Sequence, residues 1–122
     1  MGTFAVGDVA VVPFPYADFS MFKKRPALVV GQAEFDSLIL CQITSKADTS
    51  KHAILLRDTD FRQGTLHLDS YIRFDKIFTV EQSILERNIG SITPAKLQEV
   101  HRSIQGLFVP SLDLSHHPLC KL

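Results

Sequence analysis

The chain has 122 residues, of which 45% are apolar, and its 13 basic and 13 acidic side chains give a formal net charge of zero. This length and composition indicate one globular domain with a single hydrophobic core, and the balanced charge argues against a protein that coats nucleic acid through bulk charge. No apolar run reaches the roughly 18 residues of a membrane span and no signal peptide begins the sequence, so we expect a cytoplasmic protein. Its two cysteines, Cys41 and Cys120, are a poor basis for a disulfide framework.

The first half of the chain is predicted to form four short strands. Residues 9–14 form the first, and Pro13 and Pro15 are expected to end it because prolines cannot donate to a strand ladder. β-Branched and large apolar residues predict three further strands, at residues 27–30, 38–43 and 52–56.

The second half is predicted to hold two more strands and one helix. Polar and apolar residues alternate through residues 68–80, which predicts the longest strand, with one face in solvent. Residues 88–93 predict a short last strand. A helix then begins with Thr93 as its N-cap and Pro94 as its first residue, and its apolar residues recur at helical spacing: Leu97, Val100, Ile104 and Leu107 or Phe108.

The helical pattern ends after Phe108. Residues 110–122 contain two prolines and no apolar period, so we expect them to form a loosely ordered tail beyond a domain of residues 1–109. The expected fold class is mainly β: a compact, curled antiparallel sheet closed by one terminal helix.

Five segments occur in an order that resembles a known family: GDVAVVPFPYADFS, KKRPALVV, LILCQITSK, DFRQGTLHLDSYIRFDKIFTV, and NIGSIT before a helix. Over about residues 5–108 the sequence is similar to the MazF/PemK toxin endoribonucleases of bacterial toxin-antitoxin systems. The resemblance implies an SH3-like barrel of the MazF/PemK/CcdB type with a C-terminal helix. It further implies a homodimer, inhibition by a cognate antitoxin, and cleavage of single-stranded RNA at short sequences without a metal or other cofactor.

Arg25 and Thr44 are the candidate catalytic residues. RNA can cut itself when its 2′-hydroxyl attacks the neighbouring phosphate, and a protein can assist by stabilising the negative charge that develops. The guanidinium of Arg25 suits a phosphate, and Pro26 restricts the backbone that presents it. The resemblance implies that Thr44 assists Arg25 at the phosphate that is cut. The alternative for Thr44 and Ser45 is a pair of turn residues that bind their own backbone.

The remaining candidates are RNA contacts. Around the predicted catalytic pair these are Lys23, Lys24, Ser45, Lys46 and His52. Within residues 68–80 they are Ser70, Tyr71 and Arg73, because an aromatic ring can stack on a splayed base and an arginine can clamp it. Several family members carry glutamine where this chain has Ser70. The alternatives are a solvated loop for the lysines and an ordinary amphipathic strand for residues 68–80.

No metal site is predicted. Asp58 and Asp60 could hold Mg²⁺ in the manner of nuclease carboxylates, but alternate aspartates after a strand more often cap a turn. His116, His117 and Cys120 fall short of a structural zinc site in ligand count.

Two other classes of function stay open on the sequence. A catalytically silent SH3-like barrel could bind nucleic acid or protein through the same basic segment. A pure protein-interaction subunit would show no salt-dependent binding to RNA.

Overall fold

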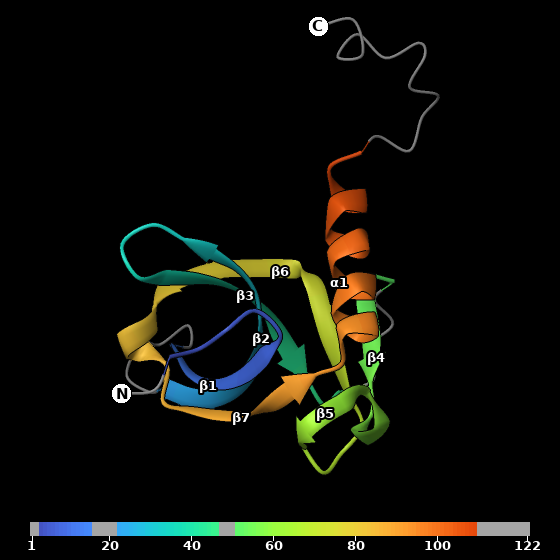
Figure 1. The fold of residues 1–122 in the computed structure, drawn as a ribbon, viewed down its shortest axis with the longest axis horizontal. Helices are drawn as coiled ribbons and strands as arrows, with labels where there is room; N and C mark the ends of the chain where they lie inside the picture. The colour runs from blue at the N-terminus through green and yellow to red at the C-terminus, as the bar shows by residue number, and fades with distance from the viewer. Residues whose placement is uncertain (1–2, 16–21, 47–50, 110–122) are drawn as a thin grey trace, which may run out of the picture.

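The computed structural model describes residues 3–15, 22–46 and 51–109. These residues form one seven-stranded sheet, two short 3-10 helices and one α-helix (Figure 1). The strands are β1 (Asp8–Pro15), β2 (Phe22–Ala33), β3 (Ser37–Thr44), β4 (Ala53–Leu56), β5 (Phe61–Gly64), β6 (Ser70–Glu81) and β7 (Arg87–Ile92). The helices are η1 (Asp58–Asp60), η2 (Gln82–Ile84) and α1 (Pro94–Leu107).

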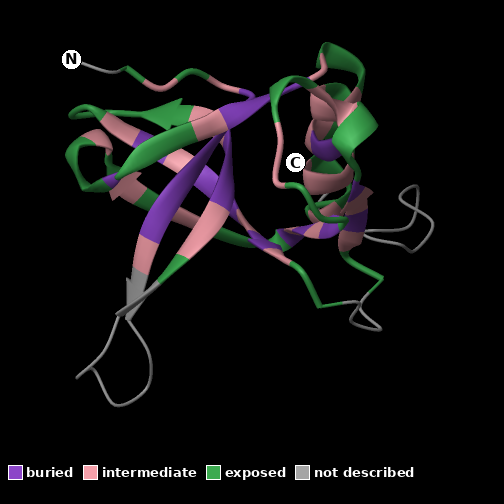
Figure 2. Ribbon diagram, turned by 90° about the horizontal axis from the view of Figure 1, so that it is seen from below, coloured by how far each residue is buried: buried purple, intermediate pink, exposed green. Residues whose placement is uncertain are grey.

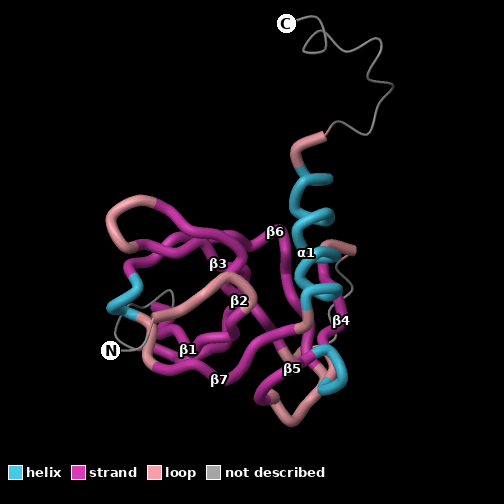
Figure 3. Tube along the Cα trace, viewed as in Figure 1, coloured by secondary structure: helices cyan, strands magenta, loops and turns pink. Residues whose placement is uncertain are grey.

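The sheet is antiparallel throughout. Figure 3 shows that it is strongly curled. Its strand order is β4-β6-β3-β2-β1-β7-β5, so β4 and β5 are its two edges. The predicted SH3-like, mainly β fold with a C-terminal helix is confirmed, but the sheet does not close into a full barrel.

Both faces of the sheet carry apolar side chains, because alternate residues of a strand point to opposite faces. One face packs against α1, and its buried residues include Val9, Leu28, Ile43, Ile72 and the helix residue Val100. The other face holds a second buried cluster, which includes Val12, Ala27, Val29, Leu40 and Leu85. Figure 2 shows buried residues in the strands and exposed residues around the turns.

The helix begins as predicted. The Thr93 side chain accepts a hydrogen bond from the Lys96 backbone N at 3.2 Å, and Pro94 occupies the first helical position. On the helix face toward the sheet, a ring nitrogen of His101 lies 2.8 Å from the carbonyl oxygen of Val30 in β2. No helix in the described part of the chain has the length and apolarity that a membrane-spanning segment requires.

The first turn of α1 ties together the two edges of the sheet. Lys96 Nζ donates to the carbonyl oxygen of Leu55 in β4 at 3.2 Å and lies 3.6 Å from the Asp60 carboxylate in η1. The backbone N of Thr93 donates to the Asp60 carbonyl oxygen at 2.8 Å. These contacts anchor the start of the helix to β4 and to η1, which leads directly into β5. Strands β4 and β5 do not pair with each other.

Replacing Lys96 with alanine should therefore lower the free energy of unfolding by about 1–3 kcal/mol, since its half-buried acceptors lose their donor. The Lys96 side chain is only 14% exposed. Arg102→Ala, on the exposed side of the same helix, should change the unfolding free energy by less than about 0.5 kcal/mol. Urea melts of the three proteins test this, and equal destabilisation by both substitutions would contradict it.

Three strands differ from the predictions made on sequence, two in their bounds and one in its relative length. Strand β1 extends one residue beyond each predicted end, to Asp8 and Pro15, and holds both prolines because β7 pairs with β1 only as far as Val11 and leaves that edge of β1 without a ladder to donate to. Strand β2 begins at Phe22, so the three cations at 23–25 are strand residues rather than a loop. Strand β6 shares its length of 12 residues with β2 and is not the single longest strand.

Strand β5 was not predicted from the sequence. Its last residue, Gly64, has a φ of 73° and is paired with Gly90 of β7. A Cβ atom at Gly64 would lie 2.1 Å from the Ile89 carbonyl oxygen, and one at Gly90 would lie 2.2 Å from the Gln63 carbonyl oxygen. Only glycine at both positions allows this close crossing. The predicted tail, residues 110–122, lies outside the described residues.

Candidate functional site

The second face of the sheet changes from apolar to polar along β3. Leu38 and Leu40 are buried in the second cluster, whereas Gln42 and Thr44 on the same face are half-buried. Residues two apart in a strand share a face, so these four side chains form one row that begins in the core and ends at solvent.

The pairing register adds residues from the neighbouring strands to this polar end. Directly paired residues of antiparallel strands share a face. Gln42 pairs with Ala27 of β2 and with Arg73 of β6, and Thr44 pairs with Tyr71. Arg25 lies two residues before Ala27, and the β2–β3 register continued by two residues puts it opposite Thr44. We call this set the polar face: Arg25, Gln42, Thr44, Tyr71 and Arg73.

A bulge in β6 fixes the orientation of Arg73. Cys41 pairs with Ile77 but Gln42 pairs with Arg73, so residues 74–76 are extra on the β6 side. Within this bulge the Asp75 carboxylate accepts from Arg73 Nε and Nη2, each at 3.1 Å. The side chain of Arg73 is 14% exposed, and the pair forms a two-pronged hydrogen bond of fixed geometry.

The charges around the bulge act on two titratable groups. The Arg73 guanidinium lowers the pKa of Asp75 below its ordinary value of 3.8, so this carboxylate is charged at neutral pH. His52 Nδ1 lies 3.8 Å from Asp75, and the His52 ring meets Phe74 edge-on. Burial raises the pKa of the Cys41 thiol to about 12, with the negative charge of Asp75 as a smaller cause. Cys41 is therefore a neutral core residue and no nucleophile.

A basic depression of about 480 Å³ includes Arg25 in its lining but opens mainly on the other face of the sheet, because Val11 pairs with Pro26 and with Arg87 while Arg25 pairs with Val12. It is lined by Val11, Lys24, Arg25, Pro26, Glu86, Arg87 and Ile89. Lys24 Nζ lies 3.0 Å from Glu86 Oε1, while Arg87 is exposed and has no ion pair within the described residues. The depression therefore carries a net positive charge next to Arg25.

The family model of PemK-like, MazF-like toxins of type II toxin-antitoxin systems matches residues 5–108. The chain belongs to this family. The match covers β1 through α1, and so includes the polar face and the basic depression of this toxin. No curated protein matches the sequence at a significant level.

Solved structures similar to the toxin agree in fold. An endoribonuclease in complex with its cognate antitoxin, from a mycobacterial species, is 19% identical with a TM-score of 0.68, covering 88% of this chain and 100% of that one. MazE–MazF from Deinococcus radiodurans is 21% identical with a TM-score of 0.67, covering 84% and 92%. Mycobacterium tuberculosis toxin MazF-mt6 is 18% identical with a TM-score of 0.61, covering 85% and 98%. At these identities the likeness establishes the fold alone.

Thr44 of the toxin is both a turn residue and a member of the polar face. Its Oγ1 accepts a hydrogen bond from the Lys46 backbone N at 3.2 Å, as the turn alternative expects. This bond does not use the hydroxyl hydrogen, which can therefore be donated to a ligand. Ser45 and Lys46 follow Thr44 as exposed residues at the end of β3.

Ser70 does not join the polar face. It is 3% exposed, its Oγ donates to the Leu68 carbonyl oxygen at 3.1 Å, and it pairs with Leu56 on the helix side of the sheet. Strand alternation thus separates Ser70 from its neighbour Tyr71, and we leave it out of the proposed RNA contacts. The side chain of Lys23 lies outside the described part of the chain.

The two aspartates of the toxin that were considered for Mg²⁺ belong to a turn. Asp58 and Asp60 form η1, and the Asp60 carboxylate accepts from the Arg57 backbone N at 2.8 Å. Among residues 3–15, 22–46 and 51–109, no group of three His, Cys, Asp or Glu side chains could hold a metal. His116, His117 and Cys120 lie outside these residues.

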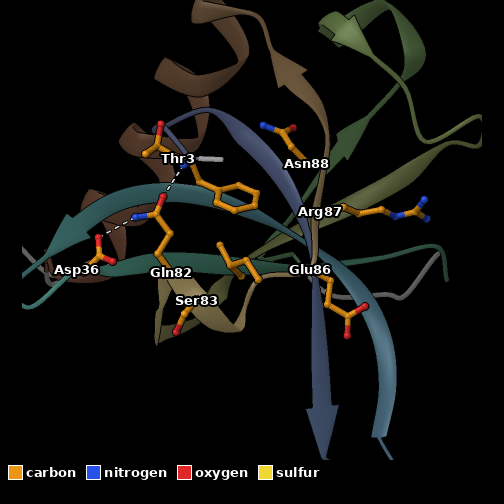
Figure 4. Close-up of a pocket in the computed structure, with 9 residues that line it drawn as sticks. Thr3, Asp36, Gln82, Ser83, Glu86, Arg87 and Asn88 are labelled. Atoms are coloured by element: carbon orange, nitrogen blue, oxygen red, sulfur yellow. Dashed lines mark hydrogen bonds between the residues drawn. The ribbon is translucent and has the colours of Figure 1, made fainter. Parts of the chain in front are cut away.

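A larger cavity of about 630 Å³ lies between the amino-terminal segment, η2 and the start of β7 (Figure 4). Gln82 spans it, accepting from the Phe4 backbone N and donating to the Asp36 carboxylate at 2.8 Å. Figure 4 shows Arg87 extending away from Gln82 and Asp36. These bonds fasten the amino-terminal segment to η2, which is a structural role.

Sequence reasoning missed two residues of the site, Gln42 and Arg87. Gln42 had a signal, since it is the single amide in the otherwise apolar strand LILCQI. Arg87 had none, because a lone cation at a strand start is common on any surface.

Proposed function

We propose that this toxin is an endoribonuclease that cuts single-stranded RNA and thereby inhibits growth and translation. The observation that carries the proposal is the placement of Arg25 and Thr44 on one polar face, beside Tyr71 and Arg73. Cations, a hydroxyl and an aromatic ring along one face suit a chain of phosphates with splayed bases.

In the proposed reaction the RNA supplies its own nucleophile. The 2′-hydroxyl attacks the adjacent phosphorus and passes its proton to water, and the bond to the 5′-oxygen breaks as that oxygen takes a proton from water. Arg25 stabilises the extra negative charge on the phosphorus oxygens, and the Thr44 hydroxyl donates a hydrogen bond to one of them. We assign no proton transfer to Arg25, since its pKa lies above about 12.

The remaining contacts are assigned by position. Lys23, Lys24 and Lys46 supply charge for flanking phosphates, with Arg87 as a further cation of the basic depression. Ser45 and His52 border the strand ends around the polar face, where they can reach RNA. Tyr71 stacks on a base, and Arg73, oriented by Asp75, contacts that base or its phosphate. No step uses a metal or another cofactor, because the nucleophile belongs to the substrate.

The direct test incubates the purified chain with a pool of single-stranded RNA, in EDTA and in Mg²⁺. We expect cleavage at the same sites and rates in both. Intact RNA that is nevertheless bound in a salt-dependent manner would identify a catalytically silent binding module instead. A requirement for Mg²⁺ would contradict the proposed chemistry.

We propose further that the toxin acts as a homodimer in the cytoplasm, that residues 1–109 are its working domain, and that a cognate antitoxin blocks it. The polar face of one chain is shallow, and a second copy would lengthen it. Light scattering at micromolar concentration should give the mass of two chains. A fully active monomer would contradict the dimer.

A further inference from the structure

We propose that Gln42 reads one base of the RNA next to the phosphate that is cut, and that this base is adenine. The inference rests on the proposed function and goes beyond it, since it names a specificity-determining residue.

The first support is the position of Gln42. It lies on β3, between the strand of Arg25 and the strand of Tyr71 and Arg73, and two residues before Thr44 on the same face. A base attached to a phosphate held by Arg25 and Thr44 would meet this side chain next. Gln42 is half-buried, so its amide has limited freedom.

The second support is the chemistry around Gln42. Its partner on β2 is Ala27, which offers the amide no polar side-chain group. Its partner on β6 is Arg73, which Asp75 clamps through two hydrogen bonds of 3.1 Å. The Gln42 amide makes no hydrogen bond within the described residues, so both its donor and its acceptor are available.

The third support is the kind of pattern that an amide recognises. Arginine and lysine only donate hydrogen bonds, and a hydroxyl offers no planar pair, whereas an amide presents a donor and an acceptor side by side. Adenine presents the matching pair on its Hoogsteen edge, at its amino group and N7, where guanine presents two acceptors, and a bidentate match of this type is worth roughly a five- to hundredfold preference over the mismatched base. The bulge in β6, opposite Cys41 and Gln42, is the kind of irregularity that re-aims side chains beside a site.

The test sequences the cleavage ends from a fully randomised RNA pool cut by four proteins: the wild type, Gln42→Ala, Gln42→Glu and the control Gln32→Ala. Gln32 is an exposed glutamine of β2, paired with Leu38 at the far end of the sheet. We expect adenine to be enriched about fivefold or more at one position beside the wild-type cut. Gln42→Ala should lose that enrichment, and the control should keep it.

Gln42→Glu keeps the shape of the side chain and decides the matter if Gln42→Ala fails to fold. A carboxylate only accepts hydrogen bonds and is the usual partner of the cytosine amino group. The base preference of the Gln42→Glu protein should therefore shift from adenine toward cytosine.

The outcomes separate this inference from the proposed function. If the wild type cuts no RNA, the proposed function fails and Gln42 has nothing to read. If the wild type cuts RNA, two results would overturn the role of Gln42 in base recognition: variants that keep the wild-type base preference, or variants that lose rate equally at all sites. The proposed endoribonuclease activity would be unaffected by either. Loss of preference for a base other than adenine overturns the adenine assignment.

Discussion

Replacing Arg25 with alanine should reduce RNA cleavage by roughly a hundredfold or more, the loss typical of removing one preorganised donor from a developing oxyanion. Arg25 is half-buried at the polar end of the second face, outside both buried clusters, so its truncation removes little core packing. Growth inhibition in cells should be lost together with cleavage. Thermal melts of the variant check that it remains folded.

Related variants sharpen this first prediction. Arg25→Lys keeps the charge but loses the planar fork, so it should recover only part of the rate. Thr44→Ala should cause a smaller loss, and Thr44→Ser, which keeps the hydroxyl, should be more active than Thr44→Ala. The matched control is Arg62→Ala, an exposed strand arginine of β5, which should cut at the wild-type rate. An Arg25→Ala protein that cuts normally would remove Arg25 from the site.

The second large effect is expected from the substrate. An RNA whose nucleotide just upstream of the cut carries a 2′-deoxy sugar should no longer be cut at that bond, because its nucleophile is gone. Binding should survive, since the phosphate contacts that dominate affinity are unchanged. The measurement compares cleavage and binding of the modified and unmodified RNA.

The control for this substrate places the 2′-deoxy sugar three nucleotides further upstream, where cutting at the original bond should continue. Cleavage of the first substrate at the unchanged bond and rate would mean that water or a protein group is the nucleophile. The assignment of Arg25 as a charge-stabilising residue could survive that result, but the proposed reaction could not.

Much of the fold could be predicted from local sequence. Helix α1 could be predicted from its own segment alone. Thr93 is its N-cap, Pro94 follows, and the apolar stripe ends near Leu107. Strand β5 escaped prediction because its pairing depends on the close approach of Gly64 and Gly90, which are 26 positions apart. The prolines of the PFP segment predict the end of β1, whereas the strand includes both, because the missing ladder on one side of β1 is a tertiary property.

The candidate site could be predicted only in part for the same reason. Motifs pointed to Arg25 and Thr44, but the register of β2 and β3 puts them on one face together with Gln42. Strand alternation in β6 then separates Ser70 from Tyr71, although the two are neighbours in sequence. A face is defined by pairing between distant segments, which periodicity within one segment does not reveal.

The measurement that tests the central claim most directly is the chemistry of the ends left on RNA cut in EDTA by the wild type, with Arg25→Ala run beside it. Attack by the 2′-hydroxyl predicts a 2′,3′-cyclic phosphate, or its opened form, on the upstream product and a 5′-hydroxyl on the downstream product. The Arg25→Ala protein should leave little of either. A 5′-phosphate on the downstream product, formed only when a divalent cation is restored, is the signature of metal-activated water and would contradict the account.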